Sequence, residues 1–119
     1  MGFSADLANG TAHWRRGSLR IKYQQQNNPS YALLRHTYAE IAKRCKTPIY
    51  SSPFNLTVHP LGGAGPGNNS HEGVINHHGE VHGHPGLYIA DGAAMPGSPG
   101  VPPSMSIAAW ASHVSEQML

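Results

Sequence analysis

The sequence predicts an α+β fold made of antiparallel hairpins and two helices. Three observations support this prediction. Apolar and polar residues alternate near the N-terminus, a helix start signal follows at Asn28-Pro29, and a short apolar stretch precedes a final helix at Ser104. Alternation is typical of half-buried strands, whereas apolar residues three and four positions apart are typical of helices. A chain of 119 residues buries roughly two-thirds of its unfolded surface, which is enough for one modest core.

The N-terminal half is predicted to be scaffold. A hairpin is expected around Arg15-Arg16-Gly17-Ser18, with alternating apolar residues Ala12, Trp14, Leu19, Ile21 and Tyr23. Asn28 can accept a hydrogen bond from a free helical N–H, and Pro29 at the first helical position removes no helical hydrogen bond. We expect the helix to end before Thr47-Pro48. Its apolar face is predicted to hold Leu34, Tyr38, Ile41 and Cys45.

The C-terminal half reads as a glycine-rich loop, short extended segments and a helix. An extended stretch from Pro53 to Val58 leads to the loop, and a second hairpin is expected from Gly73 to Val81, with its turn at His78-Gly79. The apolar run Gly86–Ala90 is predicted to be a buried strand. Residues 93–103 are too rich in glycine and proline for regular structure. Ser104 is predicted to cap the last helix, whose apolar face is Ile107, Ala111, Val114 and Met118.

Composition argues against several kinds of partner. The chain has 8 basic and 6 acidic residues, and the basic residues form no dense run, so we predict no binding to nucleic acid. No apolar stretch reaches the roughly 20 residues that span a bilayer. Cys45 is the single cysteine, so no internal disulfide can form. Together with the lack of a secretory signal at the N-terminus, this favours a cytoplasmic protein.

The segment after Ala90 has a geometry that suits a ligand. A strand, Asp91-Gly92, a long tight loop and then a helix N-terminus bring outward-pointing amides together, and the helix dipole favours electron-rich groups there. Gly92, which has no side chain, would let a ligand approach the backbone closely. Many α/β turns share this geometry, so by itself it indicates only a candidate binding site.

Three blocks of sequence carry a family resemblance. They are Val58–Gly63 (VHPLGG), Gly86–Gly92 (GLYIADG) and Pro96–Ser104 (PGSPGVPPS). In this order they resemble the C-terminal part of the glucose–methanol–choline (GMC) oxidoreductases, closest to cholesterol-oxidase-like members. The resemblance implies one C-terminal segment over residues 1–119. Residues 1–57 would be strands and a helix from the substrate-domain side, and residues 58–119 would contain the active-site loop plus the last strand and helix of an FAD-binding, Rossmann-like sheet.

The resemblance also implies roles for individual residues. His59 matches the active-site histidine, which assists hydride transfer from an alcohol to the flavin. Four residues match positions that contact FAD, and they are Asp91, Gly92, Pro103 and Ser104. The implied activity is FAD-dependent oxidation of the CH–OH group of a sterol or another bulky alcohol.

Two departures from the family pattern affect this reading. The family usually has Asn or His as the second catalytic residue, where this chain has Pro102. The Gly-x-Gly-x-x-Gly fingerprint that binds the ADP half of FAD is absent. We therefore expect a fragment that needs the N-terminal FAD-binding part of the same protein, holds no stoichiometric FAD alone and is inactive alone. Because its last strand would have unpaired edges and its final helix an apolar face, the isolated chain is expected to self-associate, swap elements or be only partly ordered.

Two alternative functions stay open at this point. The first is a metal-binding module, because His77, His78, His82 and His84 lie within eight residues, and imidazoles on one face of a hairpin can bind zinc, nickel or copper. An ordinary exposed turn explains these histidines without a metal, so none is assigned as a ligand. The second alternative is a structural remnant of the family that has lost catalysis, which Pro102 favours.

Overall fold

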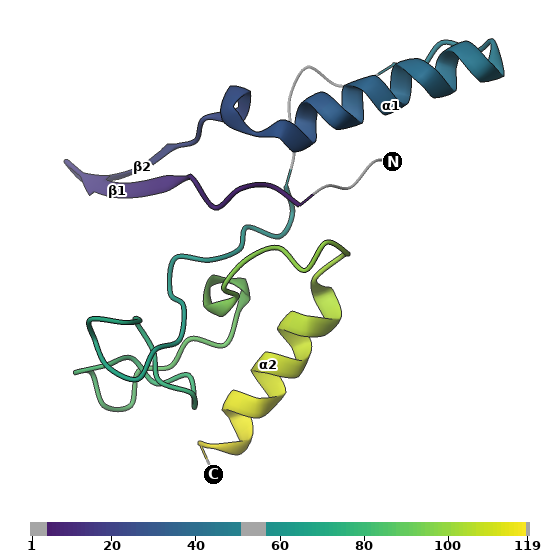
Figure 1. Ribbon diagram of the computed structural model, residues 1–119. Helices are drawn as coiled ribbons and strands as arrows, with labels where there is room; N and C mark the ends of the chain where they lie inside the picture. Colours follow the sequence, from purple (N-terminus) through teal and green to yellow (C-terminus); the bar gives the residue numbers. More distant parts are fainter. Residues whose placement is uncertain (1–4, 51–56, 119) are drawn as a thin grey trace. The chain divides into compact units, whose positions relative to one another are not determined.

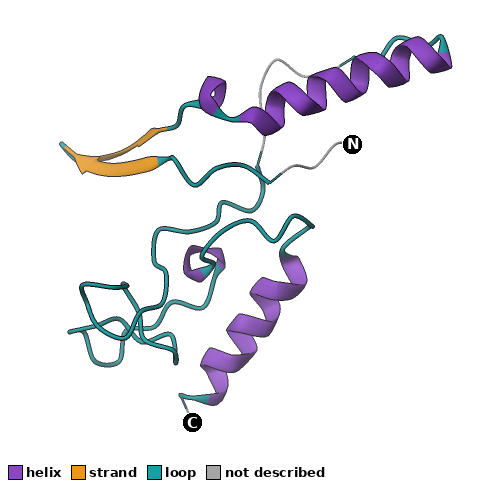
Figure 2. Ribbon diagram, in the orientation of Figure 1, coloured by secondary structure: helices purple, strands orange, loops and turns teal. Residues whose placement is uncertain are grey.

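The computed structural model describes residues 5–50 and 57–118, which belong to two compact units, residues 1–55 and 56–119 (Figure 1). Each unit is described by itself. Within the described residues, regular structure consists of two strands, two α-helices and two short 3-10 turns (Figure 2). The small α+β composition agrees with the predicted fold class. The elements are β1 (Thr11–Arg15), β2 (Ser18–Lys22), η1 (Gln25–Asn27), α1 (Pro29–Cys45), η2 (Gly92–Ala94) and α2 (Ser104–Glu116).

The first unit contains the predicted hairpin. Strands β1 and β2 pair antiparallel, with Trp14 opposite Leu19. The turn residues Arg16 and Gly17 both have positive φ, 50° and 75°. Two-residue turns with positive φ match the right-handed twist of the strands. The hairpin prediction is confirmed, with its turn at the expected residues.

The predicted start of helix α1 is confirmed in detail. The Asn28 side chain accepts a hydrogen bond from the Ser30 N–H at 3.4 Å, and Pro29 is the first helical residue. Asn28 is buried, and its amide group donates to the Tyr23 hydroxyl at 3.0 Å. The helix ends when Lys46 adopts a left-handed conformation with φ of 50°, directly before Thr47-Pro48.

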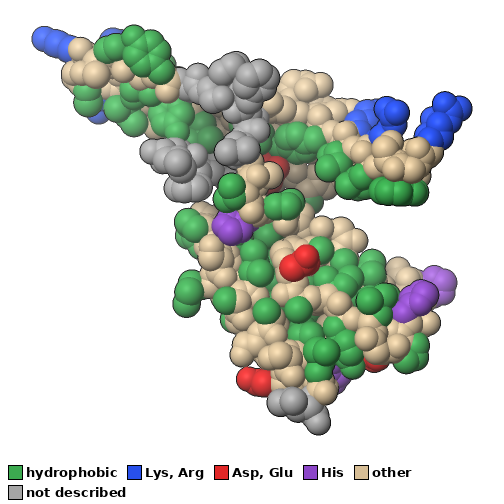
Figure 3. Space-filling view, turned by 180° about the vertical axis from the view of Figure 1, so that it is seen from behind, with side chains coloured by type: hydrophobic (Ala, Val, Ile, Leu, Met, Phe, Trp, Pro, Cys, Tyr) green, Lys and Arg blue, Asp and Glu red, His purple; other side chains and the backbone are tan. Residues whose placement is uncertain are grey.

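The core of the second unit is small and lies between loops and α2. Its buried apolar side chains are Ala64, Ile75, Ala94 and Val114. The loops are joined by backbone hydrogen bonds, such as Gly67 N to Ile75 O at 2.9 Å and Val74 N to Gly65 O at 2.9 Å. In the space-filling view, apolar side chains are spread over the visible surface among the backbone and other side chains (Figure 3). Backbone pairing therefore contributes much of the order in this unit.

Two predicted extended elements are absent as strands in residues 57–118. The Gly73–Val81 hairpin is reduced to one bridge between Ile75 and Val81, although the turn is present, with Asn76 N donating to Glu80 O at 2.9 Å. The predicted buried strand Gly86–Ala90 forms a single bridge, from Tyr88 to Glu80. A strand requires a ladder of partners, and the neighbouring loops supply only these isolated pairs. Most of the predicted Pro53–Val58 stretch lies outside the described residues.

The final helix begins as predicted, but its cap differs. Pro103 is the N-cap and Ser104 is the first helical residue, and no side chain caps the helix. Of the predicted apolar face, Val114 is buried, Ile107 and Ala111 are half-buried, and Met118 is exposed. Neither helix among the described residues is long and apolar enough to cross a membrane.

Candidate active site around His59 and Ser104

The loop that follows His59 is attached to η2 by its backbone. Gly62 N donates to Gly92 O at 3.0 Å, and Ala64 N donates to Ala93 O at 2.9 Å. Gly62 has a φ of 83°, a conformation that glycine adopts at no steric cost. These bonds fix the position of the loop relative to the segment that leads into α2. His59 itself is half-buried, and its N–H donates to the Thr57 hydroxyl at 3.3 Å.

Gly92 is buried at the contact between this loop and α2. A Cβ atom there would lie 2.9 Å from Pro60 O, 3.2 Å from Leu61 Cδ2 and 3.4 Å from Ile107 Cδ1. The first distance is shorter than real Cβ contacts allow, so a larger residue would push the loop away from the helix. The sequence suggested that this glycine admits a ligand, whereas the structure explains it by close packing inside the unit.

Asp91 is exposed and performs a local structural task. Its carboxylate accepts a hydrogen bond from Ala93 N at 2.9 Å and caps η2, the short turn shown beside α2 in Figure 1. The backbone carbonyl of Asp91 accepts from Ala94 N at 3.2 Å. The carboxylate thereby holds the turn whose carbonyls receive the His59 loop.

The structure brings His59 and Ser104 together, although they are 45 residues apart in sequence. The Ser104 Oγ lies 3.3 Å from the His59 Nε2. Pro103, the N-cap of α2, accepts the first helical hydrogen bond from Ile107 N at 2.9 Å. Pro102 is exposed and has neither an N–H nor a polar side chain to offer. An imidazole beside a hydroxyl at an uncapped helix N-terminus can bind, accept and pass on a proton.

Two side chains missed by the sequence analysis attach α2 to the loops. The Trp110 indole N–H donates to Ile89 O at 3.0 Å, and the His113 Nε2 lies 3.0 Å from His77 O. Trp110 is three residues after Ile107 and four before Val114, so helical spacing could have identified it as part of the packed face. His113 carries no comparable signal in the sequence.

The clustered histidines do not assemble as a metal site. His77 and His78 have ring centroids 3.9 Å apart, and the His78 ring stacks at 6.3 Å on that of His113. The His82 Nε2 instead lies 3.0 Å from Gly67 O. Among residues 5–50 and 57–118, no group of three His, Cys, Asp or Glu side chains is placed to hold a metal ion. The structure therefore gives no support to the metal-binding alternative.

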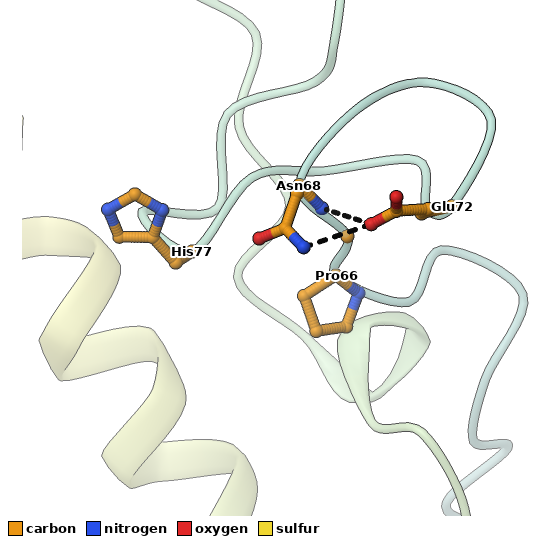
Figure 4. A pocket seen from close by; sticks show the side chains of 5 residues that line it. Pro66, Asn68, Glu72 and His77 are labelled. Carbon is orange, nitrogen blue, oxygen red and sulfur yellow. Dashed lines mark hydrogen bonds between the residues drawn. The ribbon is translucent and has the colours of Figure 1, made fainter.

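A shallow pocket of about 450 Å³ lies elsewhere in the second unit (Figure 4). The Glu72 carboxylate beside it accepts hydrogen bonds from the Asn69 side chain at 2.9 Å and from the Asn68 side chain at 3.0 Å. These bonds hold the pKa of Glu72 below its ordinary value. They are used within the loop, and the pocket shares no residue with the His59–Ser104 pair. Its lining residues are Pro66, Gly67, Asn68, Glu72 and His77.

Comparison with known proteins gives a consistent result. Residues 9–111 match the family of proteins described as GMC oxidoreductase. Cholesterol oxidases from two strains of Mycobacterium tuberculosis are 48% identical to this chain over 60 residues, which is 50% of this chain and 10% of theirs. An uncharacterized GMC-type oxidoreductase from Sinorhizobium fredii is 34% identical over 73 residues, 60% of this chain and 14% of that protein. The chain thus matches only about a tenth of the length of these cholesterol oxidases, and no solved structure matches it.

The family match covers the hairpin, α1, the His59 loop and most of α2, and the relative from Sinorhizobium fredii carries the same family description. The chain belongs to the GMC oxidoreductase family.

Proposed function

We propose that this chain forms the histidine-bearing part of an FAD-dependent oxidoreductase that oxidises the CH–OH group of a sterol or another bulky alcohol. The observation that carries the proposal is the position of His59. Its imidazole lies at the uncapped N-terminus of α2, in a loop fixed by backbone bonds to η2. Membership of the GMC oxidoreductases, which are generally FAD-dependent, supports the reaction class.

The chemistry of alcohol oxidation suits an imidazole at this place. The alcohol loses its O–H proton and a hydride from the neighbouring carbon. A neutral histidine can accept the proton near neutral pH, which makes departure of the hydride easier. Bound FAD supplies the acceptor for that hydride. His59 is half-buried, so a bulky substrate could reach it from the exposed side of the loop.

The residues present fit the flavin ring better than the rest of the cofactor. Residues 56–119 contain no lysine or arginine, and this unit can stabilise negative charge near His59 through its backbone dipoles. The first amides of α2 are uncapped by any side chain, and helix N-termini stabilise such charge. Pro103 and Ser104 would lie at the ring, and Asp91 and Gly92 would hold the turn behind it. The ADP half must bind to residues outside this set, because the glycine fingerprint is absent.

The sterol class rests on the relatives. Two proteins named cholesterol oxidase share 48% identity with half of this chain. That identity supports a bulky, apolar alcohol as the substrate. The alternative of a non-catalytic remnant predicts instead that His59 has no effect on turnover.

The test uses the native gene product and its His59→Ala variant. We expect flavin absorbance in both proteins, and oxidation of cholesterol in preference to short alcohols by the unaltered protein. Loss of the proton acceptor should lower kcat by roughly 10²- to 10⁴-fold. His71→Ala, an exposed histidine outside the pair, serves as the control. A protein without flavin, or an unchanged kcat in His59→Ala, would refute the proposal.

A further inference from the structure

The Ser104 hydroxyl is not used to cap its own helix. Pro103 occupies the N-cap position, where a serine would commonly accept a backbone N–H of the first turn, and α2 has no side-chain cap hydrogen bond. Ser104 is exposed, and its Oγ lies 3.3 Å from the His59 Nε2. The hydroxyl is thus available both to the imidazole and to a molecule that approaches the outer side of the pair.

Residue 102, two positions before this serine, offers no polar side chain to a substrate. By the family resemblance, Pro102 stands at the position where a second catalytic residue, Asn or His, is expected, and proline offers no donor or acceptor from its side chain. It is exposed. The alcohol oxygen of a bound substrate would therefore lack a second polar partner unless another residue near His59 supplies one.

We propose that Ser104 is that partner and passes the proton of the alcohol to His59. This inference rests on the proposed function. A serine hydroxyl can donate one hydrogen bond and accept others at the same time. It can therefore donate to the His59 Nε2 while it accepts from the O–H of the alcohol, which a proline at position 102 cannot do.

The proton and electron transfers balance through this arrangement. The alcohol O–H proton moves to Ser104 Oγ as the Ser104 proton moves to the His59 Nε2. The C–H electron pair of the alcohol leaves with its hydrogen as a hydride while a C=O bond forms, and FAD, when bound, would supply the hydride acceptor. The products are a carbonyl compound, a protonated His59, an unchanged Ser104 hydroxyl and the reduced cofactor. In the resting state, the same arrangement places the imidazole proton on Nδ1.

The resting state is tested on the full chain without cofactor by ¹⁵N NMR of the His59 ring. With Ser104 as donor, Nε2 should carry the shift of an unprotonated nitrogen. Ser104→Ala should change the ratio of the two tautomers by roughly fivefold, the factor expected from one ordinary hydrogen bond. Ser104→Thr keeps the hydroxyl and should keep the wild-type shifts. Ser106→Ala, in the same helical turn, is the matched control.

Turnover of the native gene product provides the second readout. Ser104→Ala should lower kcat by roughly 10- to 10³-fold, somewhat less than general-base loss, whereas Ser104→Thr and Ser106→Ala should stay close to the unaltered protein. Unchanged His59 shifts in Ser104→Ala, or equal turnover in Ser104→Ala and Ser106→Ala, would overturn the role of Ser104. Neither result affects the proposed function, which fails only if His59→Ala keeps full activity or flavin is absent.

Discussion

Replacing Gly79 with alanine tests how the loops of the second unit pack on α2. Gly79 is buried with φ of 85°. An added Cβ would lie 2.5 Å from Val114 Cγ2 and 3.3 Å from Ile89 O. The backbone conformation costs an L-residue about 1–2 kcal/mol, and overpacking of a core contact costs about 1–3 kcal/mol more. After a gain of about 0.4–1 kcal/mol from a less flexible unfolded chain, Gly79→Ala should destabilise the unit by about 2–4 kcal/mol.

Gly83→Ala separates the two costs. Gly83 has a similar φ of 77°, yet no atom outside its chain neighbours lies within 4 Å of an added Cβ. Only the backbone cost applies there, so its net effect should be about 1 kcal/mol or less. The difference between the two variants measures the collision with Val114. The double variant Gly79→Ala/Val114→Ala should lose less unfolding free energy than the sum of the losses in the two single variants, because the smaller side chain at residue 114 makes room for the added Cβ.

Urea unfolding followed by tryptophan fluorescence provides the measurement. The chain has two tryptophans, and the exposed Trp14 belongs to the other unit. A Trp14→Phe background therefore leaves Trp110, on α2, as the probe. If Gly79→Ala and Gly83→Ala shift the unfolding midpoint equally, Val114 does not pack against the turn at Gly79, and the reasoning is refuted.

Two further predictions concern helix capping and pH. Asn28→Ala should lower the stability of the first unit by about 1 kcal/mol through loss of the N-cap of α1, measured by helical circular dichroism in urea; an effect equal to that of the control Asn27→Ala would contradict the capping role. The pKa of Glu72 is held low by the Asn69 and Asn68 hydrogen bonds, so its stabilising contribution is present above the ordinary carboxyl pKa of 4.5 and is lost as pH falls through the lowered value. As pH falls, Glu72→Gln should therefore lose less stability than the unaltered chain in acid unfolding curves. Parallel curves would argue against a stabilising role of the ionised Glu72 carboxylate.

The elements that the sequence predicted correctly depend on local signals. The hairpin turn at Arg16-Gly17 and the Asn28-Pro29 helix start are set by a few adjacent residues, and both are confirmed. The prediction of a strand at Gly86–Ala90 was wrong: within residues 57–118 this segment forms a single bridge. Strand formation depends on partners that lie elsewhere in the chain. The segment's apolar residues indicated burial, which the structure shows in part, but they could not indicate how few backbone partners were available.

The sequence identified the residues of the candidate site but not the contact between them. Family resemblance singled out both His59 and Ser104 but assigned the serine to the cofactor, and the sequence pattern assigned it to the helix cap. The contact between the two side chains depends on the path of residues 60–103, where blocks such as Pro96–Pro103 show no strand pattern.

 Residues 60–103 contain 11 of the 14 glycines and 7 of the 10 prolines in the chain. Such a segment carries little periodicity from which its path could be predicted.

The position of His59 depends on backbone bonds and close packing more than on charged side chains. The His59 loop is held by Gly62 N to Gly92 O and by Ala64 N to Ala93 O, and Gly92 has no room for a Cβ between Pro60 and α2. A side chain at residue 92 would therefore move the loop away from the helix, and the His59–Ser104 contact would open with it. On this reasoning, Asp91-Gly92 marks the site because it sets the distance between the histidine loop and the helix, whether or not it also touches a cofactor.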